Sequence, residues 1–114
     1  MLYSYNDFNF DIIFNSNDFN IQIEHHEKLY GNVFIFEEIK LNNNFFTNIE
    51  IIEKIIKNCL EQKDFYSLEI KETKFIKLEF LYTNELSNIE LVLDIYPIRK
   101  DLSTNTEIIE LKKK

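Results

Sequence analysis

The side chains that could do chemistry are few, and they begin with two adjacent histidines and one cysteine, His25, His26 and Cys59. Adjacent residues of a β-strand point to opposite faces, so the two histidines do not readily serve one metal ion. Cys59 falls on the apolar face of an expected helix, where burial keeps a thiol protonated and poorly nucleophilic. We therefore expect neither a zinc site nor a catalytic cysteine.

Four glutamates near the histidines, Glu24, Glu27, Glu37 and Glu38, could gather to hold a hard cation such as Ca²⁺. Carboxylates without a partner are usually exposed, however, and a solvated outer face accounts for them much better than a cation site does. We favour the solvated face and expect no metal-binding and no cofactor-binding residue.

A serine nucleophile has no support, because Ser16, Ser67 and Ser87 lack the sharp strand-to-helix turn that presents such a residue. A small hydrolase or metal-dependent enzyme would need Glu24, a histidine and Glu37 or Glu38 to converge in one cleft. We expect them to be dispersed, and so predict no catalytic residues and no enzyme activity.

The elements that position these residues follow from the spacing of the apolar side chains. Apolar and polar residues alternate over 8–14 and again over 19–26, and the turn-forming residues 15–18 lie between, which predicts a hairpin. Gly31 is expected to supply a positive φ in a turn before a third strand over 33–41. Residues 33–36 are apolar on both faces, which indicates a central or partner-covered strand.

An amphipathic helix is predicted over 47–62, where isoleucines recur at helical spacing. Thr47 and Glu50 have the spacing of a capping box at its start. Three further strands are predicted around 66–70, 76–82 and 89–95, and Pro97 ends the last of them.

These elements predict an α+β fold: an antiparallel β-meander, one amphipathic helix and a second antiparallel β-meander (βββ-α-βββ). We expect a single domain over 1–102 and a short charged tail over 103–114. Over about residues 8–96 this order resembles the globular heads of coiled-coil scaffold proteins in centriole assembly and DNA end joining, and the resemblance implies the fold only. Such heads normally precede a long heptad helix, and only Glu107 to Lys114 remains here, so we expect no dimerisation by that route.

Composition narrows the function classes. Thirteen Lys and Arg against twenty Asp and Glu give a net charge of −7 over 114 residues, which disfavours direct binding to nucleic acid or an anionic membrane. One Gly in the chain excludes glycine-rich phosphate loops. The opening thirty residues contain no long apolar run, and a single cysteine cannot form an internal disulfide, so we expect a cytoplasmic or nuclear location.

Charge is uneven along the chain: residues 1–46 hold seven acidic and only two basic side chains. An acidic surface that also carries exposed aromatic residues suits a basic protein partner, although acidity also serves solubility. We expect a partner-binding surface containing Phe34, Phe36, Glu24, Glu37 and Glu38.

The function predicted from these features is a non-catalytic protein-interaction domain, a small subunit or adaptor of a larger macromolecular assembly. The alternative is a small acidic inhibitor that blocks the nucleic-acid-binding surface of a basic target, as an immunity protein, a nuclease or CRISPR antagonist or a ribosome-inactivating factor would. In both cases the expected partner is a protein, either basic or part of a ribonucleoprotein, and the oligomeric state is left open.

Overall fold

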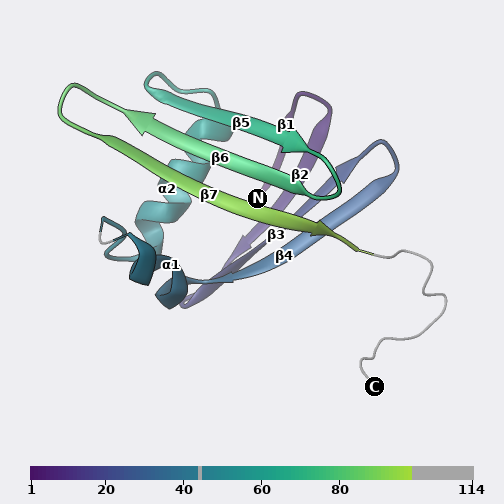
Figure 1. Cartoon of the computed structure of the whole chain (residues 1–114), viewed down its shortest axis with the longest axis horizontal. Helices are drawn as coiled ribbons and strands as arrows, with labels where there is room; N and C mark the ends of the chain where they lie inside the picture. Colours follow the sequence, from purple (N-terminus) through teal and green to yellow (C-terminus); the bar gives the residue numbers. More distant parts are fainter. Residues whose placement is uncertain (44, 99–114) are drawn as a thin grey trace.

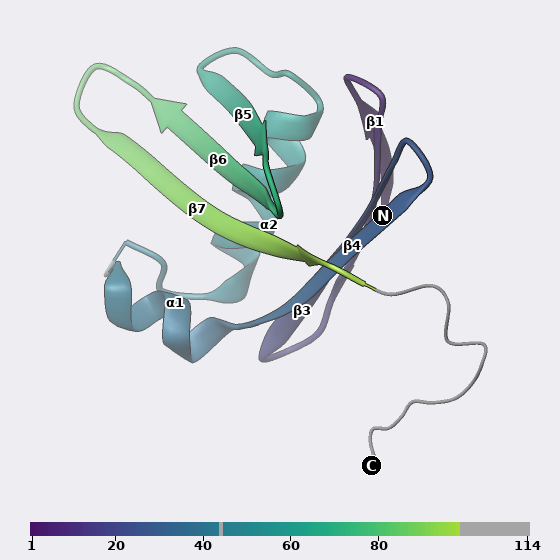
Figure 2. The same cartoon turned by 45° about the vertical axis from the view of Figure 1, so that its right-hand side comes forward.

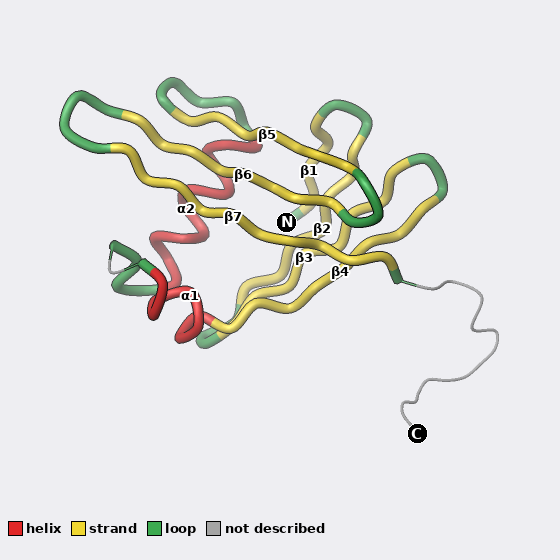
Figure 3. Tube along the Cα trace, in the orientation of Figure 1, coloured by secondary structure: helices red, strands yellow, loops and turns green. Residues whose placement is uncertain are grey.

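A computed structural model describes residues 1–43 and 45–98, which form seven strands and two helices in the order ββββ-αα-βββ (Figures 1 and 3). The elements are β1 (Leu2–Tyr5), β2 (Phe8–Phe14), β3 (Asp18–His25), β4 (Lys28–Ile35), α1 (Phe36–Asn42), α2 (Ile49–Leu60), β5 (Tyr66–Glu72), β6 (Ile76–Thr83) and β7 (Asn88–Pro97). Neither described helix is long and apolar enough to cross a membrane.

The strands form one antiparallel sheet in the order β1-β2-β3-β4-β7-β6-β5. Within β1–β4 and within β5–β7, neighbouring strands pair along most of their length. At the junction of these two halves, β4 and β7 pair only at Tyr30 with Pro97 and at Gly31 with Tyr96. The sheet therefore folds at a narrow junction, from which the two halves splay apart (Figure 2).

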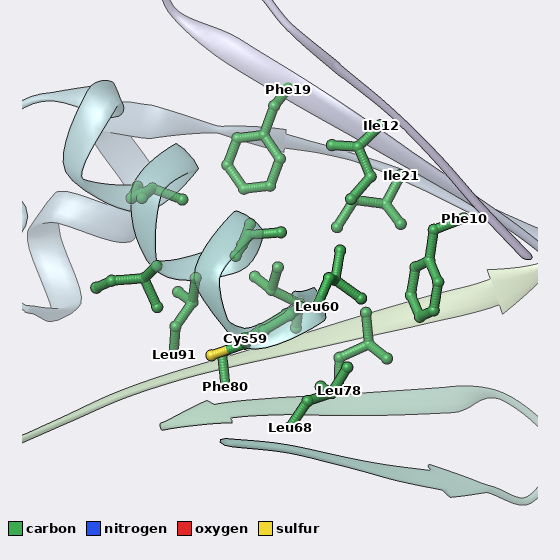
Figure 4. Packing of buried hydrophobic residues seen from close by; sticks show 14 of the residues in the cluster. Phe10, Ile12, Phe19, Ile21, Cys59, Leu60, Leu68, Leu78, Phe80 and Leu91 are labelled. Atoms are coloured by element: carbon green, nitrogen blue, oxygen red, sulfur yellow. The ribbon is translucent and has the colours of Figure 1, made fainter. Parts of the chain in front are cut away.

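The core fills the space that the curled sheet encloses, and α2 lies within it (Figure 4). The alternation seen in the sequence directs one face of each strand into this space, and the isoleucine face of α2 meets it. The residues that combine full burial with the largest side chains come from both halves of the sheet and from the segments between them: Phe10, Phe19, Phe46, Phe80, Ile12, Ile21, Ile23, Ile52, Ile56, Ile76, Leu78 and Ile95.

The α+β class and the antiparallel pairing are confirmed, but the βββ-α-βββ order is wrong. β1, which has no counterpart among the predicted strands, adds a strand at the N-terminus and pairs with β2. The predicted strand over 33–41 ends at Ile35, where α1 begins. Glu37 and Glu38 lie in the first turn of α1, where the positive end of the helix dipole favours acidic side chains.

The turn expected around Gly31 is also misplaced. The chain reverses at His26 and Glu27, whose φ values are 50° and 66°, and Gly31 lies inside β4 with no positive φ. A Cβ at this position would meet Cδ1 of Ile98, so the end of that side chain would have to shift.

The predicted long helix runs from Ile49 to Leu60, so it is shorter at both ends than expected. Its N-cap is Asn48 instead of Thr47, because the Asn48 side chain accepts a hydrogen bond from the Ile51 backbone N–H at 3.1 Å. Pro97 ends the last strand as predicted. The domain boundary at 102 and the tail over 103–114 lie outside the described residues.

Candidate functional site

The structure places the two predicted aromatic contacts differently from one another. Phe34 is half-buried and stacks on Phe19, with ring centroids 5.2 Å apart. Phe36 is only 8% exposed, because it begins α1 and packs into the core. The expectation that both rings are available to a partner is therefore wrong for Phe36.

The acidic side chains expected at the same surface are exposed but not gathered. Glu24 lies near the end of β3, opposite Leu29, whereas Glu37 and Glu38 follow Ile35, which pairs with Asp18 at the start of β3. The length of β3 thus separates Glu24 from the other two. Among the described residues, Glu24 therefore does not converge with Glu37 and Glu38.

His25 and His26 are closer to each other than expected from two strand residues. His26 belongs to the turn, and its ring centroid lies 3.9 Å from that of His25. The expectation that the two rings face apart is therefore wrong. Among residues 1–43 and 45–98, no three His, Cys, Asp or Glu side chains are arranged to hold a metal ion.

His25 belongs to a partly buried polar cluster that joins the two halves of the sheet. Its Nδ1 lies 3.2 Å from the Asp7 carbonyl oxygen and its Nε2 lies 3.5 Å from Oε1 of Glu72. Tyr30 on β4 donates its hydroxyl to Oε2 of Glu72 on β5, at 2.6 Å. Burial, reinforced by the adjacent carboxylate, raises the pKa of Tyr30 to about 12. The phenol therefore stays protonated at neutral pH and stabilises the fold.

Cys59 is buried on α2, and its thiol donates to the Leu81 carbonyl oxygen at 3.8 Å. Burial raises the pKa of this thiol to about 11. A group that holds its proton this firmly is a poor nucleophile, as expected from its position on the apolar face of the helix.

The most distinctive surface feature lies where β4 and β7 part, and no sequence motif marked it. The two strands, together with α1, enclose an open groove of about 430 Å³. We call it the β4–β7 groove, and its lining residues are Asn32, Val33, Phe34, Ile35, Glu38, Ile39, Asn42, Val92, Leu93, Asp94 and Tyr96. Of the predicted partner-binding residues, it includes Phe34 and Glu38.

A side-chain amide opens this groove. In the register of β4 and β7, the rung after Gly31–Tyr96 would pair Val33 with Asp94. Instead, Asn32 accepts from the Val33 backbone N–H at 2.9 Å and donates to the Asp94 carbonyl oxygen at 2.8 Å. The Asn32 amide thus replaces one of the two hydrogen bonds of that rung, and the pairing of β4 with β7 stops there.

Beyond Asn32, no backbone pairing covers the facing edges of β4 and β7 within the described residues. A residue in an antiparallel strand directs its N–H and C=O to the same side, and the side alternates along the strand. The Asp94 carbonyl and the Ile98 N–H both point toward β4, so the backbone groups of Val92 and Glu90 point the same way. On β4, the corresponding residues are Val33 and Ile35.

The same residues carry apolar side chains on the outer face of the sheet. Val33 is 59% exposed, Ile35 46%, Val92 45% and Tyr96 49%. The sequence held a partial signal for this surface, because residues 33–36 are apolar on both faces. On β7, Val92 and Tyr96 stand in the alternate positions that Asn88, Glu90 and Asp94 fill with polar groups.

The lining of the groove is more polar than apolar, and two of its polar residues are acidic. Glu38 and Asp94 line it, and no Lys, Arg or His does so among the described residues. A hollow of about 260 Å³ adjoins it, shares Ile39, Asn42 and Val92 with it, and adds Glu90. Within the described part of the chain, the buried Oδ1 of Asp94 has no hydrogen-bond partner.

Comparisons with known proteins identify the fold and no family. Neither the protein-family models nor the curated proteins give a match to this chain. A crystal structure of the head domain of human CCDC61 is similar, with a TM-score of 0.69 and 12% sequence identity, covering 86% of this chain and 98% of that one. At this identity the likeness concerns the fold alone.

Proposed function

We propose that this chain is a non-catalytic protein-interaction domain that binds a partner protein through the β4–β7 groove, as a small subunit or adaptor of a larger assembly. The observation that carries the proposal is the pair of open strand edges with exposed apolar side chains on both. Monomeric proteins rarely leave unpaired strand edges and apolar side chains together at the surface, because such edges invite association. The likeness to a head domain concerns the fold and identifies no partner.

The geometry around the ionisable groups favours binding over catalysis. His25, Tyr30 and Glu72 contact one another and the Asp7 carbonyl oxygen within the fold, and Cys59 is buried with a raised pKa. Neither group lines the β4–β7 groove.

A test is affinity purification of the tagged chain from its own cells at about 0.1 M and about 0.5 M salt, ionic strengths at which screening differs about two-fold in Debye length. The wild-type chain is expected to retain a stoichiometric partner at both salts, since apolar contacts resist salt. Val92→Lys should lose that partner. Ile13→Lys is the matched control, because Ile13 on β2 is 49% exposed but lies outside the groove.

The result that contradicts the proposal is the absence of a partner at either salt, or a partner that Val92→Lys and wild type retain equally. A basic nucleic-acid-binding partner that is lost at the higher salt would instead support the inhibitor function. The observation that favours this second function is the set of acidic side chains on the outer faces of β2 and β3, which includes Asp11 and Glu24.

A further inference from the structure

We infer that the β4–β7 groove takes an extended strand from its partner, in which apolar residues alternate and a lysine or arginine lies against Asp94. The inference rests on the proposed function and specifies the chemistry of the partner segment. Three independent properties of the groove carry it: its open backbone edge, the placement of its apolar side chains and its charge.

The backbone edge of β7 favours an added strand over a helix. Glu90, Val92 and Asp94 direct their N–H and C=O groups into the groove, and Asn32 occupies only the Asp94 carbonyl. At about 3.4 Å per residue, the stretch 90–94 spans roughly 17 Å, the length of an ordinary short strand. An extended peptide can pair with such an edge through its main chain, whereas a helix has no free backbone groups to offer.

The apolar side chains fit the two-residue period of a strand. Val33 and Ile35 on one wall, and Val92 and Tyr96 on the other, point to the outer face of the sheet. A strand lying between the walls would place alternate side chains beside them. Its other side chains would point toward Phe34 and Ile39, which also line the groove and are only partly buried. Apolar residues at alternate positions would therefore be covered on binding.

The charge of the groove selects a cationic partner residue. Glu38 and Asp94 line the groove, Glu90 lines the adjoining hollow, and both lack basic side chains among the described residues. Asp94 lies opposite Lys77 in the register of β6 and β7, yet its buried Oδ1 has no hydrogen-bond partner among the described residues. A neutral segment in the groove would desolvate the rest of this carboxylate at a cost. A lysine or arginine beside the Asp94 carboxylate would offset that cost by donating a charge-assisted hydrogen bond.

The experiment is selection of random linear dodecapeptides, displayed on phage, against the full chain at about 0.15 M salt. We expect a consensus with alternating apolar residues and one lysine or arginine. A synthetic consensus peptide should bind Asp94→Asn at least ten-fold more weakly than wild type, and Val92→Lys should not bind it. Glu69→Gln, on the exposed face of β5, should bind as wild type does.

Two changes in the peptide test the inference without altering the fold of the protein. Replacing its basic residue by glutamine should weaken binding to wild type about as much as Asp94→Asn does, and should weaken binding to Asp94→Asn little. Methylating alternate backbone nitrogens on the paired side should abolish binding, since it removes main-chain donors.

Other outcomes separate this inference from the proposed function. Groove-dependent peptides without a basic residue, or peptides that bind as helices, would overturn the inference while the interaction function stands. A chain that dimerises in sedimentation, with the dimer lost in Val92→Lys, would show that a second copy occupies the groove and would also overturn it. The selection could also yield no peptide that depends on the groove, while Val92→Lys still loses the cellular partner. That pair of results would reject the extended-strand mode of binding and leave the interaction function standing.

Discussion

Asn32 and Asp94 meet where the sheet divides, and the Asn32 side-chain amide donates to the Asp94 carbonyl oxygen at 2.8 Å. Because the same amide accepts from the Val33 N–H at 2.9 Å, one polar side chain satisfies the donor and the acceptor of one of the two hydrogen bonds that the next rung would form. An interrupted ladder usually leaves unsatisfied backbone groups. Here the two hydrogen bonds of Asn32 stabilise the interruption, so the open groove is part of the folded structure.

Asn32→Ala should therefore lower the free energy of unfolding by about 1–2 kcal/mol, since it removes two hydrogen bonds at a half-buried position. Urea unfolding followed by circular dichroism measures the change. Asn20→Ala is the matched control, because Asn20 lies on the neighbouring strand and its side chain makes no hydrogen bond within the described residues. Equal losses in the two variants would show that the Asn32 amide does not stabilise the junction.

Hydrophobic periodicity was enough to predict most strands and the position of α2. The alternation over 8–14 and the isoleucine spacing over 49–60 each reflect one buried face, and burial is the property that sets periodicity. The predictions fail where the local hydrophobic pattern and the tertiary contacts favour different structures. Residues 33–36 form an apolar run, but the strand ends at Ile35, and Phe36 packs into the core as the first residue of α1.

The groove could be predicted only in part, because it depends on two strands that are distant in sequence. The doubly apolar stretch around Val33 and Ile35 signalled an unusual strand. Nothing in the sequence placed Val92, Asp94 and Tyr96 opposite this stretch. Their position depends on the pairing of β4 with β7, which involves only two residues of each strand. The asparagine that opens the groove looked like an ordinary turn residue beside Gly31.

The turn at His26 and Glu27 offers a gain in stability. Both residues have positive φ, a conformation that costs residues with a Cβ about 1–2 kcal/mol and glycine almost nothing. Glu27→Gly should raise the free energy of unfolding by about 0.5–1 kcal/mol, after the greater flexibility of glycine in the unfolded chain is deducted. Thermal and urea unfolding measure this change.

The same substitution in a strand provides the control for that turn. Glu24 is exposed like Glu27 but lies within β3, so Glu24→Gly should destabilise the protein by about 0.5–1 kcal/mol. If both variants lose stability, the positive φ at Glu27 is not a source of strain.

Cys59 should resist thiol reagents in the folded protein. Its pKa, raised to about 11 by burial, leaves roughly 100-fold less thiolate at pH 8 than an ordinary cysteine has, and the sulfur is also shielded. Absorbance with an aromatic disulfide reagent should show slow labelling at pH 8 and rapid reaction of one thiol per chain in concentrated urea. Fast labelling of the folded chain would show that Cys59 is accessible and would reopen its use as a nucleophile.

The hydrogen bond between Tyr30 and Glu72 predicts a particular loss of stability in alkali. The folded state raises the pKa of Tyr30 from its ordinary value of 10.0 to about 12, so its contribution is complete below pH 10 and disappears as the pH rises toward 12. Tyr30→Phe should lower the free energy of unfolding by about 1–2 kcal/mol at pH 7, because it removes a hydrogen bond to a carboxylate, and should make the decline between pH 10 and 12 shallower.

Urea unfolding at a series of pH values tests both effects. Tyr96→Phe is the control, because the Tyr96 hydroxyl makes no hydrogen bond within the described residues. Cys59, whose pKa is also raised, contributes a decline between about pH 9 and 11 that is common to all three proteins, so the difference between them reports on Tyr30. A decline that is equally steep in Tyr30→Phe and wild type would mean that deprotonation of Tyr30 does not limit stability in alkali.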